Sequence, residues 1–350
     1  MEVTVLKSAG EVASLGDAWN RLTADFDAPT ARHDWVCTAI EQLAGSGEVV
    51  VVCVFDAGDL VAAAPLIRRR GRLELIGQAE LGEPGGFVYR DAASLHRLVT
   101  GIAALRSPLV LDDIVAGSPV VKALRDVGGS RVVVRASSAC PSLEIPSEVD
   151  EVGVVLSASL RSDLRRAQRR AGEFGAPSFE MHTPTSPEQL NSLWSDVLRV
   201  EAAGWKGRSG TALRHDAAVG AFFAAYSRRA MERKELRLGV LDIAGTTAAV
   251  MVAAEWDARL WLLKIGFDER YAAASPGLLL LEGAVAHVLG RNLRSLEFLG
   301  SAAPWTRRWT QVERPLVTVR SYPYTARGLA ALGAAALRSA LKSSRRGERR

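Results

Sequence analysis

The chain has 350 residues, of which 48% are hydrophobic and 24% are charged, and its formal net charge is +5. This composition is typical of a soluble globular protein and excludes disorder over most of the chain, and the length accommodates two domains that each bury a core. No apolar run reaches the roughly 20 residues that a membrane-spanning helix needs. Residues 1–5 show neither a basic segment nor a long apolar one, so we expect no secretory signal and a cytoplasmic location.

Neither a structural metal nor a disulfide is expected. The three cysteines, Cys37, Cys53 and Cys140, are far apart and form no C-x-x-C pair, which fits reduced thiols. The five histidines are also scattered, and none has the spacing of a metal-binding pair.

The first half predicts alternating strands and helices. Its clearest signal is a hairpin, in which apolar residues 49–55 and 60–66 flank the turn residues Asp-Ala-Gly-Asp at 56–59. Residues 82–86 are rich in glycine and predict a loop. The pattern further predicts strands at 3–7, 72–76, 109–111 and 131–136, and helices at 17–25, 35–43, 92–105 and 119–127.

Residues 140–155 contain two prolines and little periodicity, so we expect the domain boundary there, close to Asp150. This interpretation gives a first domain of residues 1–150, a second of residues 151–325 and a basic amphipathic tail of residues 326–350.

The second half predicts a similar alternation. Residues 240–250 resemble residues 54–64, because in both an apolar strand ends at an Asp-containing turn and returns as a strand of small residues, which hints at a duplicated fold. The pattern predicts helices at 160–173, from about 187 to 203 and at 216–233, a strand at 178–182, and three consecutive strands at 236–242, 247–255 and 260–266.

The most informative stretch follows the third of these strands. Apolar residues 260–267 lead through the small-residue loop 268–277 into a helical run at 278–289. This order collects backbone N–H groups and the positive end of a helix dipole at one point, which suits a pyrophosphate. Pro276 fits a first helical turn, and Gly277 lets the backbone approach a ligand. The sequence therefore predicts a site for a nucleotide-type cofactor.

Five segments keep a characteristic order and spacing: residues 160–166, 201–212, 264–271, 275–280 and 300–305. Together they resemble the GNAT-fold acetyltransferases of the CelD/BcsL type, a FemAB-like group named for an association with cellulose or exopolysaccharide biosynthesis. Trp19, Trp35 and residues 61–66 fit the more divergent partner domain of that group. The resemblance spans most of residues 10–325.

The resemblance implies an α/β (α+β) fold of tandem GNAT-like domains, each a mixed, mostly antiparallel sheet flanked by helices. It implies acetyl-CoA or another acyl-CoA as co-substrate. The usual loop reads Arg/Gln-x-x-Gly-x-Gly/Ala, and here Ala272 and Ser275 replace its first and fourth residues. The residues implied for the cofactor are Leu263, Lys264, Ile265 and Gly266 on the strand and Ala274, Ser275, Pro276, Gly277 and Leu278 at the helix start.

Acyl transfer to an amine needs donors for the developing oxyanion and a group that takes the ammonium proton. Backbone N–H groups near Ile265 are candidates for the first role. A carboxylate or a tyrosine can relay this proton, so Glu255 and Tyr271 are the catalytic candidates. The alternative for Glu255 is a charged turn residue, and Tyr271 otherwise lines the pocket or belongs to the core. Lys264 interrupts an apolar strand, so it either faces CoA phosphates or pairs with Glu255 or Asp268.

A polar, glycine-rich loop supplies the candidate acceptor site. Its residues Glu201, Trp205, Lys206 and Arg208 combine an aromatic ring with charges, which suits a sugar or amino-sugar acceptor. The alternative for Lys206 is a solvated loop charge.

Two basic segments have open roles. The arginines of residues 161–170 lie mostly on one helix face, which is either simply solvated or binds a CoA phosphate, an acidic polymer or nucleic acid. Residues 329–341 are amphipathic and precede a basic tail that either packs on the domain or rests on an anionic membrane surface.

The leading hypothesis is an N-acyltransferase that moves an acetyl group from acetyl-CoA to an amine-bearing small molecule or saccharide precursor. The FemAB-like kinship keeps aminoacyl transfer from charged tRNA open, with the arginine helix on RNA phosphates. Otherwise no nucleic acid partner is expected. The third hypothesis is a non-catalytic module that binds polysaccharide or assembles a synthase.

Overall fold

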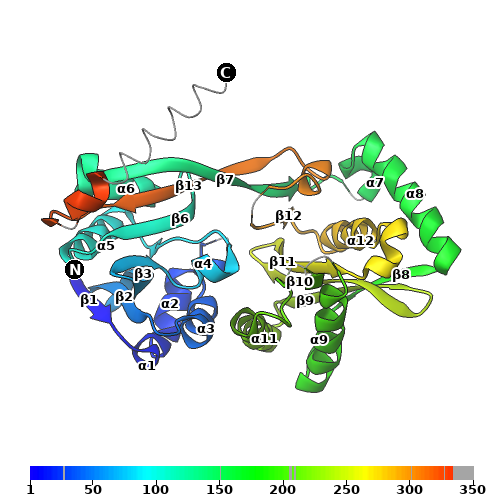
Figure 1. The fold of residues 1–350 in the computed structure, drawn as a ribbon, viewed down its shortest axis with the longest axis horizontal. Coiled ribbons are helices and arrows are strands. Elements are labelled where there is room, and N and C mark those ends of the chain that lie inside the picture. Colours follow the sequence, from blue (N-terminus) through cyan, green and yellow to red (C-terminus); the bar gives the residue numbers. More distant parts are fainter. Residues whose placement is uncertain are drawn as a thin grey trace. The chain divides into compact units, whose positions relative to one another are not determined.

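The computed structural model describes residues 1–26, 28–149, 151–204, 207–208, 210–300, 302–326 and 328–333. The chain forms two compact units, each with a sheet and flanking helices (Figure 1). The first unit comprises Met1–Asp25, Ala31–Ser138 and the chain from Pro315 onward, and the second comprises Phe26–Thr30 and Ala139–Arg314.

The sheet of the first unit has the strand order β1-β2-β3-β4-β6-β13-β7, with β5 paired to β3. Strands β4 and β6 are parallel, and the pairs β1–β2, β2–β3, β3–β4, β3–β5 and β6–β13 are antiparallel. The strands are β1 (Glu2–Leu6), β2 (Glu48–Asp56), β3 (Asp59–Arg69), β4 (Arg72–Leu75), β5 (Val88–Tyr89), β6 (Leu109–Val115), β7 (Val132–Glu144) and β13 (Glu313–Ser321).

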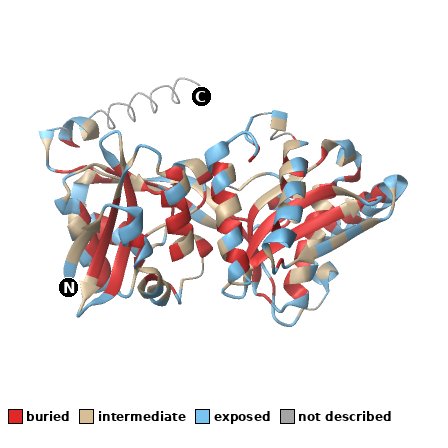
Figure 2. Cartoon of the chain, turned by 90° about the horizontal axis from the view of Figure 1, so that it is seen from below, coloured by how far each residue is buried: buried red, intermediate tan, exposed pale blue. Residues whose placement is uncertain are grey.

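Helices cover this sheet and enclose its core. The strands carry many β-branched residues, and Figure 2 shows their buried residues in red. The core includes Val52, Leu66, Leu98 and Leu111, which are fully buried. The helices are α1 (Ala9–Ala13), α2 (Gly16–Leu22), α3 (His33–Leu43), α4 (Gln78–Leu81), α5 (Ala92–Ala104) and α6 (Pro119–Gly128), with short 3-10 turns η1 (Pro29–Ala31) and η2 (Gly129–Arg131).

The predicted hairpin is confirmed as β2–β3. Its central residues Ala57 and Gly58 both have positive φ, 51° and 93°, and Asp56 pairs with Asp59. Such two-residue turns match the right-handed twist of the strands that they join. The hairpin β9–β10 in the second unit has the same kind of two-residue turn at Ala244 and Gly245, with φ values of 55° and 71°.

The sheet of the second unit has the order β7-β12-β11-β10-β9-β8. Among the strand pairs of this sheet whose register is described, β11–β12 is parallel and the others are antiparallel. The predicted architecture, a mixed and mostly antiparallel sheet flanked by helices, is confirmed in both units. The remaining elements are α7 (Val152–Val155), α8 (Ala158–Phe174), β8 (Pro177–His182), α9 (Pro187–Ala202), α11 (Ala217–Glu232), β9 (Leu236–Ile243), β10 (Thr246–Trp256), β11 (Arg259–Phe267), η3 (Glu269–Ala274), α12 (Pro276–Gly290), β12 (Ser295–Glu297) and η4 (Thr306–Arg308).

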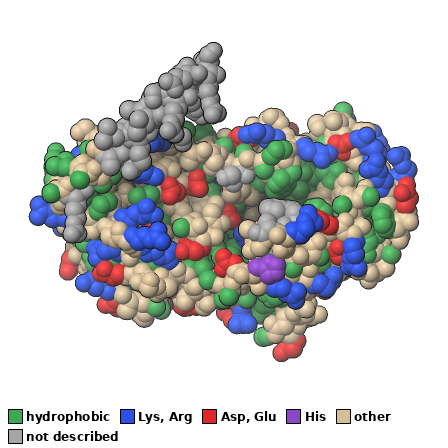
Figure 3. All heavy atoms as spheres, in the orientation of Figure 1, with side chains coloured by type: hydrophobic (Ala, Val, Ile, Leu, Met, Phe, Trp, Pro, Cys, Tyr) green, Lys and Arg blue, Asp and Glu red, His purple; other side chains and the backbone are tan. Residues whose placement is uncertain are grey.

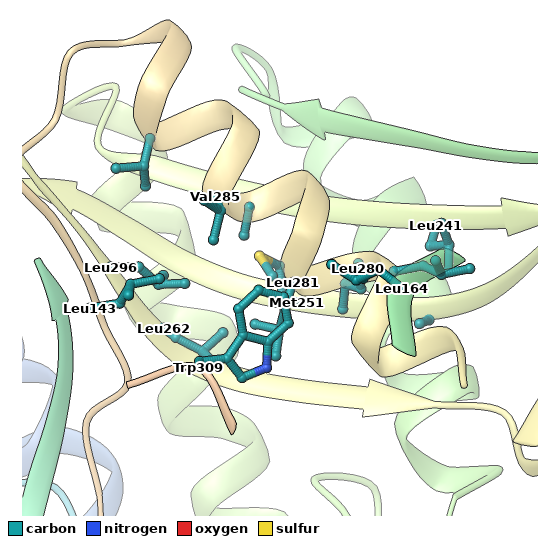
Figure 4. Close-up of a cluster of buried hydrophobic side chains, with 14 of the residues drawn as sticks. Leu143, Leu164, Leu241, Met251, Leu262, Leu280, Leu281, Val285, Leu296 and Trp309 are labelled. Atoms are coloured by element: carbon teal, nitrogen blue, oxygen red, sulfur yellow. The ribbon is translucent and has the colours of Figure 1, made fainter. Parts of the chain in front are cut away.

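Helix α12 forms the centre of the second core. It is apolar on most of its circumference, as expected of a helix that is buried against a sheet. Leu280, Leu281 and Val285 of α12 lie against Met251 and Leu262 of the strands (Figure 4).

The observed units differ from the expected domain limits at both ends. Residues 140–144 were expected in an irregular connection, but they continue β7, because Ser142 pairs with Glu297 of β12. Strand β13 was not predicted, and from Pro315 it belongs to the first unit, where it pairs with β6. Most of the predicted basic tail, from residue 334 on, lies outside the described residues. No helix in the described ranges is both long and apolar enough to cross a bilayer.

Replacement of Gly283 tests the packing of α12. A Cβ atom at this position would lie 2.3 Å from Cγ of Phe179 on β8, so Gly283→Ala forces the helix and the strand apart. We expect the free energy of unfolding to fall by about 1–3 kcal/mol, measured by urea denaturation.

Gly172→Ala is the matched control in helix α8, because a Cβ atom there meets nothing within 4 Å. It should raise the free energy of unfolding by about 0.5–1 kcal/mol, since alanine has the higher helix propensity. Equal effects of the two substitutions would contradict close packing at Gly283.

Candidate functional site

Strand β11 forms a long ladder with the strand on one side and a short ladder with the strand on the other. Its antiparallel ladder with β10 runs from Arg259 to Phe267. Its parallel ladder with β12 covers only Arg259, Leu260 and Trp261. From Leu262 onward β11 therefore has no register partner on β12, and the two parallel strands part at this point.

A β-bulge lies where the two strands part. The register with β10 passes from Ala253↔Leu262 to Val252↔Lys264, so Leu263 is the extra residue. A bulge re-aims the side chains beyond it. Lys264 consequently lies on the α11 side, with Nζ 4.5 Å from the ring centroid of Phe223.

Two glycines bring the end of α9 against β11. A Cβ atom at Gly266 would lie 2.8 Å from Cα of Glu201, and one at Gly204 would lie 2.8 Å from the carbonyl oxygen of Phe267. The space left between α9, β10 and Lys264 is too small to hold a water molecule. This face of β11 is thus closed by protein.

Asp268 fixes the loop that follows β11. Its side chain is buried, and its Oδ1 accepts a hydrogen bond of 3.0 Å from the backbone N–H of Arg270, whose Nη2 donates to Oδ2 at 2.6 Å. The N–H of Asp268 donates to the carbonyl of Ala248 at 2.8 Å. The hydrogen bond from Arg270 outweighs the effect of burial and holds the pKa of Asp268 below its ordinary value.

The loop after β11 leads into α12, whose first turn is not capped by a side chain. Ser275 adopts a left-handed conformation, with φ 51° and ψ 54°, and its side chain caps no N–H of α12. Leu278 donates its N–H to the carbonyl of Ser275 at 2.9 Å. A Cβ atom at Gly277 would meet only Phe267, at 3.7 Å, so an approaching group has room there. Ala274 and Pro276 on either side of Ser275 are buried.

Tyr271 anchors the loop to α8. Its ring is partly buried against the core and packs edge-on against Phe174, with 5.7 Å between the centroids. Arg170 of α8 donates from Nη1 to the carbonyl of Ala273 at 3.5 Å. The basic face of α8, seen as blue side chains in Figure 3, therefore adjoins the loop.

The end of α9 adjoins the same loop. Glu201 is buried, and its Oε2 accepts a hydrogen bond of 2.8 Å from the N–H of Leu213. Arg208 forms an ion pair with Glu269 of η3. The structure thus brings two of the predicted acceptor residues, Glu201 and Arg208, next to the predicted cofactor loop. Trp205 and Lys206 lie outside the described residues.

Glu255 lies away from this group. It pairs with Leu260 at one end of the β10–β11 hairpin, whereas Ala249, six residues earlier, pairs with Phe267 at the loop end. At about 3.4 Å per residue, these ends are about 20 Å apart.

The carboxylate of Glu255 is also fully engaged. Its Oε2 lies 2.8 Å from Nε of Arg237 and 3.3 Å from Nε2 of His287, and its Oε1 accepts from Arg291 at 2.9 Å. Burial raises the pKa of Glu255, but these basic partners outweigh it and hold the pKa below its ordinary value. A carboxylate with a lowered pKa is a weaker base, and these contacts give Glu255 an ion-pairing role.

Sequence reasoning overlooked Glu297. This residue is 1% exposed and stands opposite Trp261, where the β11–β12 ladder ends. Its Oε1 accepts from the hydroxyls of Ser142 and Ser295 at 2.9 and 2.7 Å, and its Oε2 accepts from Arg314 at 2.6 Å. A single charge inside the apolar run 296–299 was the signal that marked it. The hydrogen bonds of Glu297 thus lie at the end of the β11–β12 ladder and stabilise it there.

Metal ligation finds no support in the described part of the chain, where no cluster of three or more His, Cys, Asp or Glu residues could hold an ion.

Asp268→Asn tests the loop anchor. Losing the charge on a buried hydrogen-bonded acceptor should lower the free energy of unfolding by about 1–2 kcal/mol at pH 7. Because the folded-state pKa of Asp268 is lowered, its contribution is complete above the ordinary value of about 3.9 and disappears as the pH falls through the folded-state pKa.

Urea denaturation of both proteins between pH 7 and pH 2.5 measures this contribution. The difference in stability should stay constant down to about pH 5 and then shrink. A difference that grows on acidification would contradict the assignment.

Comparison with known proteins shows what these elements are similar to. Residues 158–307 match the model of a family described as acetyltransferase (GNAT) domain. The matched segment runs from the start of α8 into η4. It contains β11, η3, α12 and β12. This part of the chain is thus similar to GNAT-fold acetyltransferase domains. A comparison with curated proteins found no match.

Solved structures of the same fold cover nearly the whole chain. The C-terminal domain of a protein described as a lysylphosphatidylglycerol synthetase, from Agrobacterium fabrum, has 12% identity and a TM-score of 0.59, covering 94% of this chain and 97% of that one. FemX has 10% identity and a TM-score of 0.58, covering 91% and 97%. L-PGS from Bacillus licheniformis has 11% identity and a TM-score of 0.55, covering 90% and 95%. At such identities the likeness concerns the fold.

Proposed function

We propose that this chain, whose residues 158–307 are similar to GNAT-fold acetyltransferase domains, is an N-acyltransferase that moves an acetyl group from acetyl-CoA to an amine. One observation carries the proposal. Strand β11 is bulged at Leu263, has no partner on β12 after Trp261 and leads through η3 to the start of α12, where no side chain caps the helix.

The residues at the helix start fit a diphosphate. Backbone N–H groups of the first turn of a helix attract anions, and the side chain of Ser275 makes no hydrogen bond to them. Pro276 has no N–H and the N–H of Leu278 donates to Ser275, so Gly277 offers the donor nearest the helix start. Gly277 leaves room for close approach. In this proposal Ala274, Ser275, Pro276, Gly277 and Leu278 hold the diphosphate, and Leu263, Lys264, Ile265 and Gly266 hold the chain that carries the thioester.

The chemistry requires little beyond placement. The bound donor supplies an activated acyl group as a thioester. The acceptor nitrogen attacks its carbonyl carbon, a C–N bond forms, the C–S bond breaks, and the ammonium proton passes to the departing thiolate. Backbone N–H groups near the bulge at Leu263 stabilise the oxyanion. Holding the reactants together supplies much of the rate.

The acceptor enters beside the end of α9. Glu201 orders the segment that follows this helix through its bond to Leu213, and Arg208 reaches η3 through Glu269. We therefore keep Glu201, Trp205, Lys206 and Arg208 as the acceptor residues and Tyr271 as a pocket residue. The resemblance to the CelD/BcsL type supports a saccharide or cell-envelope precursor as the amine.

Gly277→Glu tests the donor site. A carboxylate at the helix start repels a diphosphate, so calorimetric titration with acetyl-CoA should show an affinity at least about 100-fold below that of the unaltered protein. Gly277→Ala is the matched control, because its methyl group makes only an ordinary contact with Phe267. The control should bind within about threefold of the unaltered protein. Retained binding in Gly277→Glu, or no binding to the unaltered protein, would refute this site.

Aminoacyl transfer from charged tRNA is the second candidate. The exposed arginines of α8 favour it, since Arg165 and Arg169 present charge beside the loop that α8 contacts. The name of one similar structure, lysylphosphatidylglycerol synthetase, indicates attachment of an amino acid in that protein.

Titration with unacylated tRNA separates the two candidates. If the first holds, acetyl-CoA raises the melting temperature, and tRNA binds no more tightly to this protein than to the Arg165→Gln/Arg169→Gln variant. If the second holds, tRNA binding is steeply salt-dependent and falls in that variant, and acetyl-CoA leaves the melting temperature unchanged.

A further inference from the structure

The first unit contains a cavity of about 410 Å³. It lies between α5, α6 and the end of β13, which are neighbours in Figure 1. Its volume falls in the range of about 300–1,000 Å³ that is usual for small-molecule sites. The cavity belongs to the first unit and lies outside the segment with the GNAT match.

The walls of the cavity are apolar and its polar groups are basic or neutral. Arg106 and Arg131 contribute two positive charges, and Ser107 and Ser321 contribute hydroxyls. No Asp or Glu occurs among the described residues that line it. The apolar lining comes mainly from Val99, Ile102, Leu109, Leu124 and Val127. This combination suits a ligand with an apolar body and a negative head.

Arg131 is held in place but only partly bonded. Its Nη1 donates to the carbonyl of Tyr322 at 2.9 Å, and its Cζ lies 3.6 Å from the ring centroid of Tyr324. Its Nε is buried and has no hydrogen-bond partner among the described residues. Tyr322 and Tyr324 thus fix the charge of Arg131 at the wall of the cavity.

The charge of Arg131 selects the head group of the ligand. Because Nε is covered by protein, a head group in the cavity meets the guanidinium as a fixed positive charge, together with that of Arg106, and a carboxylate supplies the opposite charge on a small apolar body. We propose that the cavity binds a small amphipathic carboxylate, whose apolar body lies between α5 and α6 and whose carboxylate pairs with Arg131.

Calorimetry with octanoate and octan-1-ol tests the proposal on the full chain. The two probes share the apolar body and differ in the head group. Octanoate should bind at one site, and octan-1-ol should bind at least about tenfold more weakly, since it cannot form the charged pair.

Three variants locate the site. Arg131→Met should weaken octanoate binding at least about tenfold, and Arg131→Lys should weaken it less, since it keeps the positive charge. Ala103→Phe fills the mouth of the cavity from an exposed helix position, so it should abolish binding without disturbing the fold. Arg97→Met, on the exposed side of α5, is the control and should bind as the unaltered protein does.

Equal binding of octanoate and octan-1-ol would overturn the role of Arg131. Undiminished octanoate binding in Ala103→Phe, or no binding to the unaltered protein, would overturn the site itself.

Discussion

The second unit depends on the unequal pairing of strand β11. One edge is bonded to β10 over the whole strand, whereas the other is bonded to β12 over three residues. The buried network around Glu297 secures these three residues, so the strands are held firmly together and then part. A sheet that opens at a fixed point, next to a bulge, offers backbone groups to a ligand without unfolding.

Close packing brings the other elements to this opening. Gly266 and Gly204 let the end of α9 touch β11, and Gly283 lets α12 touch Phe179 of β8. These contacts fix the direction of α12 and with it the position of its first turn. The loop between β11 and α12 is also held in place. The side chain of Asp268 accepts a hydrogen bond from Arg270, and its N–H donates to Ala248 of β10. The candidate site is therefore built on a rigid frame.

The two ends of the β10–β11 hairpin differ in charge and in role. At one end, Glu255 forms ion pairs with Arg237 and Arg291 and also contacts His287. At the other end, the start of α12 keeps its partial positive charge, because Ser275 does not cap it. Anions are thus drawn to the loop end. The exposed arginines of α8 add to this field.

The sequence by itself determined the local elements and the strand–loop–helix at residues 260–290, because hydrophobic periodicity and turn residues act over short distances. It missed strands β12 and β13, whose formation depends on distant partners such as Ser142 and Val115. Tertiary structure alone decided that Glu255 lies remote from the loop, that Glu297 is buried beside Trp261, and that Arg131 borders a cavity. These are distances between side chains far apart in the chain, and only strand register and packing set them.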